Sequence, residues 1–322
     1  MVYWRILQVN ITKKNIKFKS VLVTGGCGFI GSNLVDKLIL ANHKVFVIDN
    51  MSTGLESNLN SLATYLFNDI RDYINDRGKL FKIIKENNIK IVYHLAALSD
   101  VRLSINDPIQ CYNVNQFASI AILDACVDAG IKKLIFASTS AVYGTPIYQP
   151  VDENHSLNPI SPYGLSKLAF EQYAKYRSGG NMEIIIFRLP NVYGPRQRPD
   201  LEGGVVAIFH DLMSKNEDVT FFGDGQQTRD WVHVNDITKV FTILLEKSLK
   251  YYEIIPVGSG IQNTLWDLFC YLSSVLNYNK PPIIVQERNG DIKHMCMSGK
   301  KVKKLLQWEP TIKLADGMKI LS

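Results

Sequence analysis

The chain has few of the features that mark secreted, membrane-spanning or zinc-binding proteins. Its 322 residues include five cysteines, an odd number with no C-x-x-C pair. This pattern predicts no disulfide framework and no metal site, and reduced thiols favour the cytoplasm. No apolar run approaches the roughly 18 residues of a membrane helix, and basic residues interrupt the first 20 positions. The net charge of +6 is dispersed except for lysines near position 300, which indicates a solvated helix face and no nucleic-acid partner.

The sequence does contain a repeated alternation of short apolar strands and helices. Strands are expected at 21–24, 44–48, 63–67, 89–95, 133–137 and 183–188, and helices at 33–40, 78–87, 107–129 and from 162 onward. Repeated βα units predict an α/β fold with a doubly wound parallel sheet and right-handed crossovers.

After Pro195 the alternation breaks. Residues 221–230 have a loop-like composition, a strand near 256–258 can return to the main sheet, and 265–276 is expected to be helical. We therefore expect a first domain over 20–190 and a smaller lobe over 191–322, partly interleaved with it. Residues 1–19 form an extension that the sequence leaves open as either an added strand or a tail.

A glycine-rich turn joins the first expected strand to the first helix. Gly26, Gly28 and Gly31 fit G-x-G-x-x-G, in which glycines let the backbone approach a pyrophosphate at a helix N-terminus. The next strand ends in Asp49, about twenty residues further on, where a carboxylate binds the ribose hydroxyls of NAD. The same carboxylate repels a ribose phosphate, so the pattern favours NAD over NADP.

A second candidate site is the segment Ser161–Lys167. Ser161 followed by Pro162 is typical of a helix start, which places Tyr163 and Lys167 four residues apart on one helix face. A free phenol titrates at about 10, and a neighbouring ammonium lowers the pKa of the phenol. The pair therefore suggests a tyrosine that acts as a base.

These motifs together resemble the extended short-chain dehydrogenase/reductase family, in particular its NAD-dependent nucleotide-sugar epimerase/dehydratase branch. The resemblance runs from about Val21 to Pro310. The segments that carry it, in order, are 24–31, 49–50, 68–72, 94–97, 113–115, 138–144, 163–167, 188–196 and 223–230. It implies a Rossmann-type sheet with a smaller C-terminal α/β substrate-binding lobe, NAD as cofactor, and a homodimer formed by the helices that begin near Asp107 and Pro162.

The resemblance also implies roles for individual residues. Thr139, Tyr163 and Lys167 are the implied catalytic residues. The implied cofactor residues, besides Tyr163 and Lys167, are Gly25, Gly28, Phe29, Ile30, Gly31, Asp49, Asn50, Asp69, Ile70, Leu95, Ala96, Ala97, Asn115 and Ser138. The implied substrate residues, besides Thr139, are Asn191, Gly204, Val205, Arg229, Arg288, Asp291 and Met295. Arginine forks match diphosphate oxygens.

Two positions bear on the reaction. Sugar 4,6-dehydratases of this branch typically follow the catalytic threonine with Asp and Glu, whereas this chain has Ser140 and Ala141, which cannot act as carboxyl acids or bases. The sequence thus favours a 4-epimerase on a UDP-hexose or UDP-N-acetylhexosamine, and the flexible Met295 leaves the choice between these sugars open. The alternatives are a uronate 4-epimerase, with Arg102 or Arg198 on the carboxylate, another enzyme that acts through a 4-keto nucleotide sugar, and a non-catalytic NAD-binding regulator.

Overall fold

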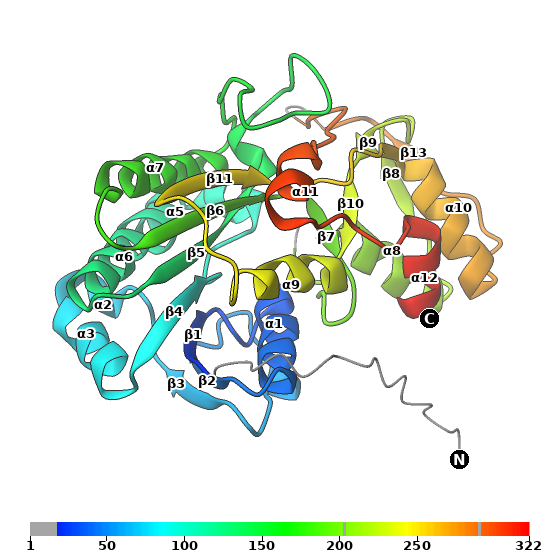
Figure 1. The fold of residues 1–322 in the computed structure, drawn as a ribbon. Coiled ribbons are helices and arrows are strands. Elements are labelled where there is room, and N and C mark those ends of the chain that lie inside the picture. Colours follow the sequence, from blue (N-terminus) through cyan, green and yellow to red (C-terminus); the bar gives the residue numbers. More distant parts are fainter. Residues whose placement is uncertain (1–17, 202–203, 289–290, 322) are drawn as a thin grey trace.

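A single parallel sheet forms the centre of the molecule. The computed structural model describes residues 18–201, 204–288 and 291–321. Its seven strands lie in the order β11-β6-β5-β4-β1-β2-β3, and all neighbouring strands are parallel (Figure 1). Their bounds are β1 Ser20–Thr24, β2 Lys44–Asp49, β3 Thr64–Phe67, β4 Ile89–His94, β5 Lys133–Thr139, β6 Glu183–Leu189 and β11 Tyr252–Pro256. The strand order changes direction between β1 and β4, with β2 and β3 on one side of this point and β5, β6 and β11 on the other, as in a doubly wound fold.

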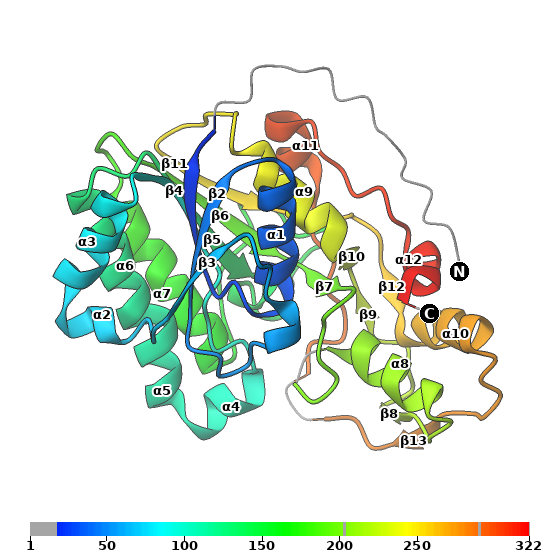
Figure 2. The ribbon, with the colours of Figure 1, turned by 90° about the horizontal axis from the view of Figure 1, so that it is seen from below.

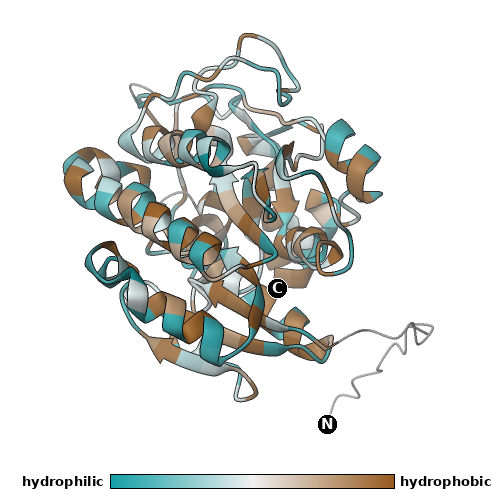
Figure 3. Ribbon diagram, turned by 60° about the vertical axis from the view of Figure 1, so that its left-hand side comes forward, coloured by the Kyte–Doolittle hydropathy of each residue, from teal (hydrophilic) through white to brown (hydrophobic). Residues whose placement is uncertain are grey.

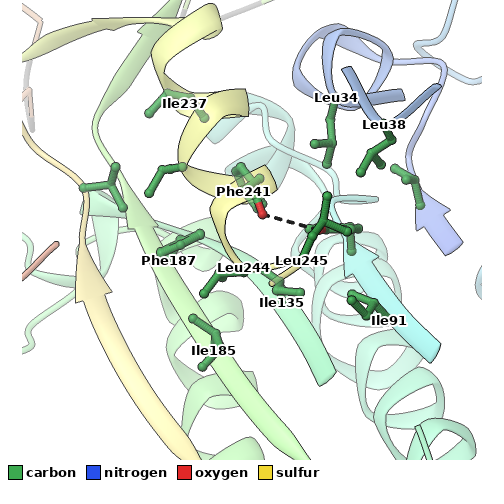
Figure 4. Packing of buried hydrophobic residues seen from close by; sticks show 14 of the residues in the cluster. Leu34, Leu38, Ile91, Ile135, Ile185, Phe187, Ile237, Phe241, Leu244 and Leu245 are labelled. Carbon is green, nitrogen blue, oxygen red and sulfur yellow. Dashed lines mark hydrogen bonds between the residues drawn. The ribbon is translucent and has the colours of Figure 1, made fainter. Parts of the chain in front are cut away.

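Helices cover both faces of this sheet (Figure 2). One face carries α1 (Phe29–Leu40) and α9 (Val234–Ile243), whose apolar side chains pack on the strands in one buried cluster. Leu34 and Leu38 of α1 approach Phe241 and Leu245 above Ile91 and Ile135 (Figure 4). The hydroxyl of Tyr93 in this cluster donates a hydrogen bond to the carbonyl oxygen of Phe241.

The other face carries α3 (Arg77–Glu86), α6 (Ala118–Asp128) and α7 (Pro162–Arg177). Their buried side chains, such as Leu80, Ile122 and Phe170, form a second cluster with the alternate residues of the strands. In Figure 3, apolar and polar residues alternate in bands along the helices. Two apolar layers thus enclose the sheet, which fixes the strand ends that carry the candidate site.

One expected helix is more irregular than its sequence suggests. The single helix predicted over 107–129 consists of α5 (Pro108–Tyr112), a π-helical turn over Asn113–Phe117 and α6. A separate short helix, α4 (Val101–Asn106), precedes it. The π turn contains the buried Asn115, whose side-chain amide is hydrogen-bonded to the backbone of Leu98. Such turns often occur at functional sites, and propensity alone does not reveal them.

The C-terminal part forms a smaller set of elements beside the sheet (Figures 1 and 2). Its core joins α8 (Val205–Ser214), α10 (Leu265–Leu276), β8 (Thr220–Phe222) and α12 (Leu314–Leu321). Three two-stranded ladders complete it: β7 (Asn191–Tyr193) with β10 (Trp231–His233), β9 (Thr228–Arg229) with β12 (Asn263–Thr264), and β8 with β13 (Ile283–Val285).

Several sequence expectations can be compared directly with these elements. The helix expected at 265–276 is confirmed as α10, and the lysine-rich segment forms α11 (Lys300–Leu306). The interpretation of 221–230 as loop was wrong in part, because β8 and β9 include some of these residues. The returning strand is β11, which ends at Pro256 instead of covering 256–258. The expectation for residues 1–17 lies outside the described residues, and no described helix is long and apolar enough to cross a membrane.

Candidate active site

The predicted cofactor turn follows β1, beside the point between β1 and β4 where the strand order changes direction. Gly25 follows β1 with φ of +72°, and a Cβ there would stand 2.6 Å from the backbone nitrogen of Ala96 after β4. Only glycine fits this close approach without strain. Gly28 caps α1, and a Cβ on Gly31 would stand 2.0 Å from the carbonyl oxygen of Gly25. The three glycines thus bring β1, α1 and the end of β4 together.

The N-terminus of α1 begins at this turn. Gly28 provides no side-chain cap, and the first turn contains no acidic residue. Phe29 and Ile30 begin the helix here. Unsatisfied N–H groups and the positive end of a helix dipole suit a diphosphate, so the cradle fits the pyrophosphate of NAD.

The predicted ribose and adenine residues gather at the ends of β2 and β3. Asp49 is held in place because its carboxylate accepts hydrogen bonds from the backbone nitrogens of Cys27 and Met51, at 2.9 and 2.8 Å. The Asn50 amide donates to Asp69 at 2.7 Å. Hydrogen bonds from Arg71 lower the pKa of Asp69 to about 2, so this carboxylate is charged at neutral pH, and Ile70 next to it is buried.

The three predicted catalytic residues lie at the end of β5 and the start of α7. Ser161 caps α7 through a hydrogen bond from the nitrogen of Gly164, as predicted from its sequence. Lys167 is 2% exposed; its ammonium donates to the carbonyl oxygen of Ala137 at 2.9 Å and lies 4.5 Å from the centre of the Phe136 ring. The Thr139 side chain is a hydrogen-bond partner of Tyr163. A phenol, a hydroxyl and an amine are therefore grouped at the end of β5 and the start of α7.

The pKa of Tyr163 differs from the expectation. The sequence predicted that Lys167 lowers it, but burial raises the pKa of Tyr163 in the protein alone, with the Thr139 hydrogen bond opposing this rise. The reason is that burial acts on both groups: it also lowers the pKa of Lys167 to about 7. A partly neutral amine is a weak electrostatic partner for a phenol.

The side chains of two predicted cofactor residues, Asn115 and Ser138, are engaged in hydrogen bonds to other protein groups. The Asn115 amide bonds both backbone groups of Leu98 and donates to the hydroxyl of Ser166 and the thiol of Cys111. Ser138 donates its hydroxyl hydrogen bond to Glu171. Both side chains are almost fully buried. These contacts give Asn115 and Ser138 a supporting position, whereas Leu95, Ala96 and Ala97 follow the C-terminal end of the central strand β4.

Sequence reasoning missed a buried ion pair below this site. Glu171, one helical turn after Lys167, is 0% exposed and binds Arg188 of β6 with a shortest nitrogen–oxygen distance of 2.6 Å. The guanidinium of Arg188 also lies 4.9 Å from the centre of the Tyr143 ring. The available signal was a charged residue near the end of the otherwise apolar run 184–189.

The candidate substrate residues lie in the C-terminal elements. Asn191 begins β7, and Arg229 in β9 donates to the carbonyl oxygens of Thr228 and Lys293. Asp291 is the acid whose charge acts on Arg229. Gly204 and Val205 begin α8, and the Arg288 guanidinium lies 3.6 Å from the centre of the Phe222 ring.

Met295 occupies a different position from these polar residues. It is 4% exposed and packs in a small apolar cluster with Val142 and Tyr143, which follow Thr139 in the chain. A methionine in this cluster links the C-terminal elements to the turn after β5. The site as a whole thus combines a glycine-rich turn at a helix N-terminus, a phenol with a hydroxyl and an amine, and arginines in the C-terminal elements.

Known proteins of one family are similar to this chain over most of its length. The sequence profile described as "NAD dependent epimerase/dehydratase family" matches residues 21–258. A UDP-glucose 4-epimerase of Mycolicibacterium smegmatis is 33% identical over 300 residues, which covers 92% of this chain and 95% of that protein.

Two solved structures are similar over nearly the whole chain. A UDP-glucose 4-epimerase of Thermotoga maritima with UDP-glucose superposes with a TM-score of 0.89 at 36% identity, covering 94% of this chain and 97% of that one. A UDP-N-acetylglucosamine 4-epimerase of Methanobrevibacter ruminantium, in complex with UDP-N-acetylmuramic acid, gives 0.88 at 34% identity, covering 95% and 97%. The profile match and these identities establish that the chain belongs to the NAD dependent epimerase/dehydratase family.

Proposed function

We propose that this protein is an NAD-dependent nucleotide-sugar 4-epimerase that acts on a UDP-hexose or UDP-N-acetylhexosamine through a 4-keto intermediate. The observation that carries this proposal is the grouping of Thr139, Tyr163 and Lys167 beside the glycine cradle. The turn that follows Thr139 consists of Ser140, Ala141 and Val142. It supplies no carboxyl group to assist loss of water, which is why epimerisation is favoured over dehydration.

The protein groups divide the work of the reaction. Tyr163 takes the proton of the sugar 4-hydroxyl while Thr139 donates a hydrogen bond to the same oxygen. Lys167, held by the carbonyl oxygen of Ala137, stabilises the phenolate of Tyr163 when it carries its charge. After the keto sugar has turned in the site, Tyr163 returns the proton to the new 4-hydroxyl. Tyr163 therefore gains and loses one proton in each turnover, with no net change.

The glycine cradle, Asp49 and the cluster of Asn50 with Asp69 are the groups that would hold NAD. Bound there, NAD supplies a positively charged ring and a site that accepts a hydride from C4 and returns it. Asp49 is already fixed by two backbone hydrogen bonds, so a ribose can bind without rearranging this side chain. A 2′-phosphate would meet the Asp49 carboxylate and be repelled, which supports NAD as the cofactor.

The C-terminal residues would anchor the nucleotide while the sugar turns. Arg229 supplies a cation to the diphosphate, Asn191 and the Gly204 turn flank it, and Asp291 lies near Arg229. The two solved relatives described above are UDP-sugar complexes, which supports uridine as the base. Binding energy from the nucleotide retains the reactive keto sugar in the site.

A uronate 4-epimerase is less well supported. Of the two arginines considered for a sugar carboxylate, Arg198 is bound to Asp200 and donates to the carbonyl oxygen of Thr53 at 3.0 Å. Its charge is therefore already paired. No specific observation in the described residues favours this second function.

The proposed function makes a direct experimental prediction. With UDP-glucose, UDP-N-acetylglucosamine and UDP-glucuronate supplied side by side, we expect C4 epimerisation of at least one of the first two, and no net consumption of NAD. Deuterium placed at C4 should remain in the product, because the hydride leaves and returns within one closed site. The label is followed by NMR and mass spectrometry. Loss of the label to water, or inactivity toward all three sugars, would contradict the proposal.

We also propose a homodimer formed by α4, α5 and α7. These helices contact one another and expose apolar side chains that a monomer would leave in water. The exposed residues of these helices include Val101, Leu103, Ile105, Ile109 and Leu165. A two-fold contact would cover the same surface on both copies. We expect analytical ultracentrifugation at micromolar concentration to give twice the chain mass, and Ile109→Asp to shift the protein to monomer; a wild-type monomer would refute the interface.

The cytoplasm is the compartment that we propose for this enzyme. All five cysteines are free thiols, and four of them, Cys27, Cys111, Cys126 and Cys296, are buried. Free thiols persist where the environment is reducing. NAD and nucleotide sugars are also available there.

A further inference from the structure

The carboxylate of Asp230 is a junction between separate parts of the chain. It is 1% exposed and accepts hydrogen bonds from the nitrogen and hydroxyl of Ser259, the nitrogen of Gly260 and the nitrogen of Met297. The Met297 nitrogen lies 3.1 Å from the carboxylate. Two segments far apart in sequence, at 259–260 and at 297, are thus bound to the carboxylate of a third.

The backbone of Asp230 adds a fourth segment. Its carbonyl oxygen accepts the hydrogen bond from the nitrogen of Asn191 at 3.1 Å, where β7 pairs with β10. The converging segments also pack closely, since a Cβ on Gly258 would stand 2.0 Å from the carbonyl oxygen of Met297. There is therefore little space in which these segments could shift independently.

These same segments carry the proposed substrate residues. Asn191 begins one of them, Arg229 immediately precedes Asp230, and Met295 lies two residues before Met297. The nitrogen of Met295 also donates to the carbonyl oxygen of Thr228 in the strand of Arg229. Asp230 itself is buried and faces away from solvent, so it acts through its neighbours and not by touching the substrate.

We propose that Asp230 is a positioning residue that assembles the nucleotide-sugar pocket by fastening the segments of Asn191, Arg229 and Met295 to one another. This inference rests on the proposed function, because it assigns the pocket to a nucleotide sugar. It concerns substrate binding and leaves the cofactor cradle and the Tyr163 hydroxyl unaffected.

The charge of Asp230 matters to this role. Its carboxylate uses both oxygens as acceptors, whereas a protonated carboxyl directs a hydrogen at one of the surrounding donors. Burial raises the pKa of Asp230 to about 6, with its hydrogen bonds opposing the rise. The titratable or charged groups around it are Arg229, the Cys296 thiol and His294, which contacts Thr228. Mild acid should therefore loosen the junction.

The experiment compares two buried aspartates in the complete, NAD-loaded protein. Asp236 accepts hydrogen bonds from the nitrogen and hydroxyl of Thr311 and from the nitrogen of Ile312, a segment that holds no proposed substrate residue, so Asp236→Asn is the matched control. We expect Asp230→Asn to raise KM for UDP-glucose about tenfold or more, since hydrogen bonds to a charged group are lost. Its kcat should stay within about threefold and its NAD content should equal that of wild type. Equal KM values for the two variants would overturn the proposal.

Two further measurements test the proposal if the Asp230→Asn variant does not fold. Ser259→Ala removes one donor and should raise KM for UDP-glucose about threefold. In the wild-type protein, KM should rise as the pH falls through about 6. A pH-independent KM, or the same pH dependence in a folded Asp230→Asn variant, would refute the role of this carboxylate. If wild type binds UDP-glucose in calorimetry but does not epimerise it, the proposed function fails, and the same comparison made on binding affinity still decides the role of Asp230.

Discussion

Replacing Tyr163 with phenylalanine should lower kcat by about 10²- to 10⁴-fold, the usual contribution of a positioned general acid or base. The substitution removes one oxygen and keeps the ring that packs at the start of α7. Because Tyr163 takes and returns the proton of the 4-hydroxyl, both halves of the reaction lose the same group. KM for the nucleotide sugar should change much less, since nucleotide binding is assigned to the other lobe.

Tyr173→Phe is the matched control for this experiment. Tyr173 is on the same helix, but its hydroxyl donates to Asp124 of α6, which is not one of the candidate catalytic residues. Both variants should keep the wild-type circular dichroism and melting temperature within a few degrees. Epimerisation is measured by coupling the product to a sugar-specific dehydrogenase. A Tyr163→Phe enzyme with near-normal kcat would exclude this hydroxyl as the base.

The parts of the site that sequence could predict are those fixed by local rules. The glycine spacing, the strand that ends in Asp49 and the cap at Ser161 each depend on residues close together in the chain. Local geometry then dictates the position of Gly31 against Gly25 and of Lys167 one turn after Tyr163. The α/β alternation similarly determined the parallel sheet, because helix and strand periods differ clearly in this sequence.

The features that sequence did not reveal all depend on contacts between distant segments. Asp230 binds groups near 259 and 297, and the π turn at Asn115 forms where its amide binds Leu98. The predicted direction of the shift in the Tyr163 pKa was wrong for a related reason. Spacing showed the neighbouring amine, but only the folded structure shows that burial raises the pKa of Tyr163 and lowers that of Lys167.

Arg188→Met should lower the free energy of unfolding by about 3–5 kcal/mol, the range measured when one member of a buried ion pair is removed. Glu171 would then remain at 0% exposure with Ser138 as its hydrogen-bond donor. Methionine fills much of the arginine volume, so the loss would come from an uncompensated charge and not from a cavity. Chemical denaturation monitored by tryptophan fluorescence measures the change.

Arg77→Met provides the control, because the Arg77 side chain is 52% exposed and its partner Asp124 keeps Arg177 and Tyr173 as partners when Arg77 is replaced. Loss of such a half-exposed arginine should cost at most about 1 kcal/mol, and a loss of similar size in Arg188→Met would contradict the prediction. The double variant Arg188→Met/Glu171→Met should regain most of the lost stability, since apolar replacements of a whole buried pair are often neutral. We nevertheless expect this stable double variant to have a lower kcat than wild type. Ser138 loses its acceptor in it, and Ser138 lies between Ala137, which holds the Lys167 ammonium, and Thr139, which contacts Tyr163. Recovered stability without recovered turnover would separate the two roles of the ion pair, because packing alone would restore both.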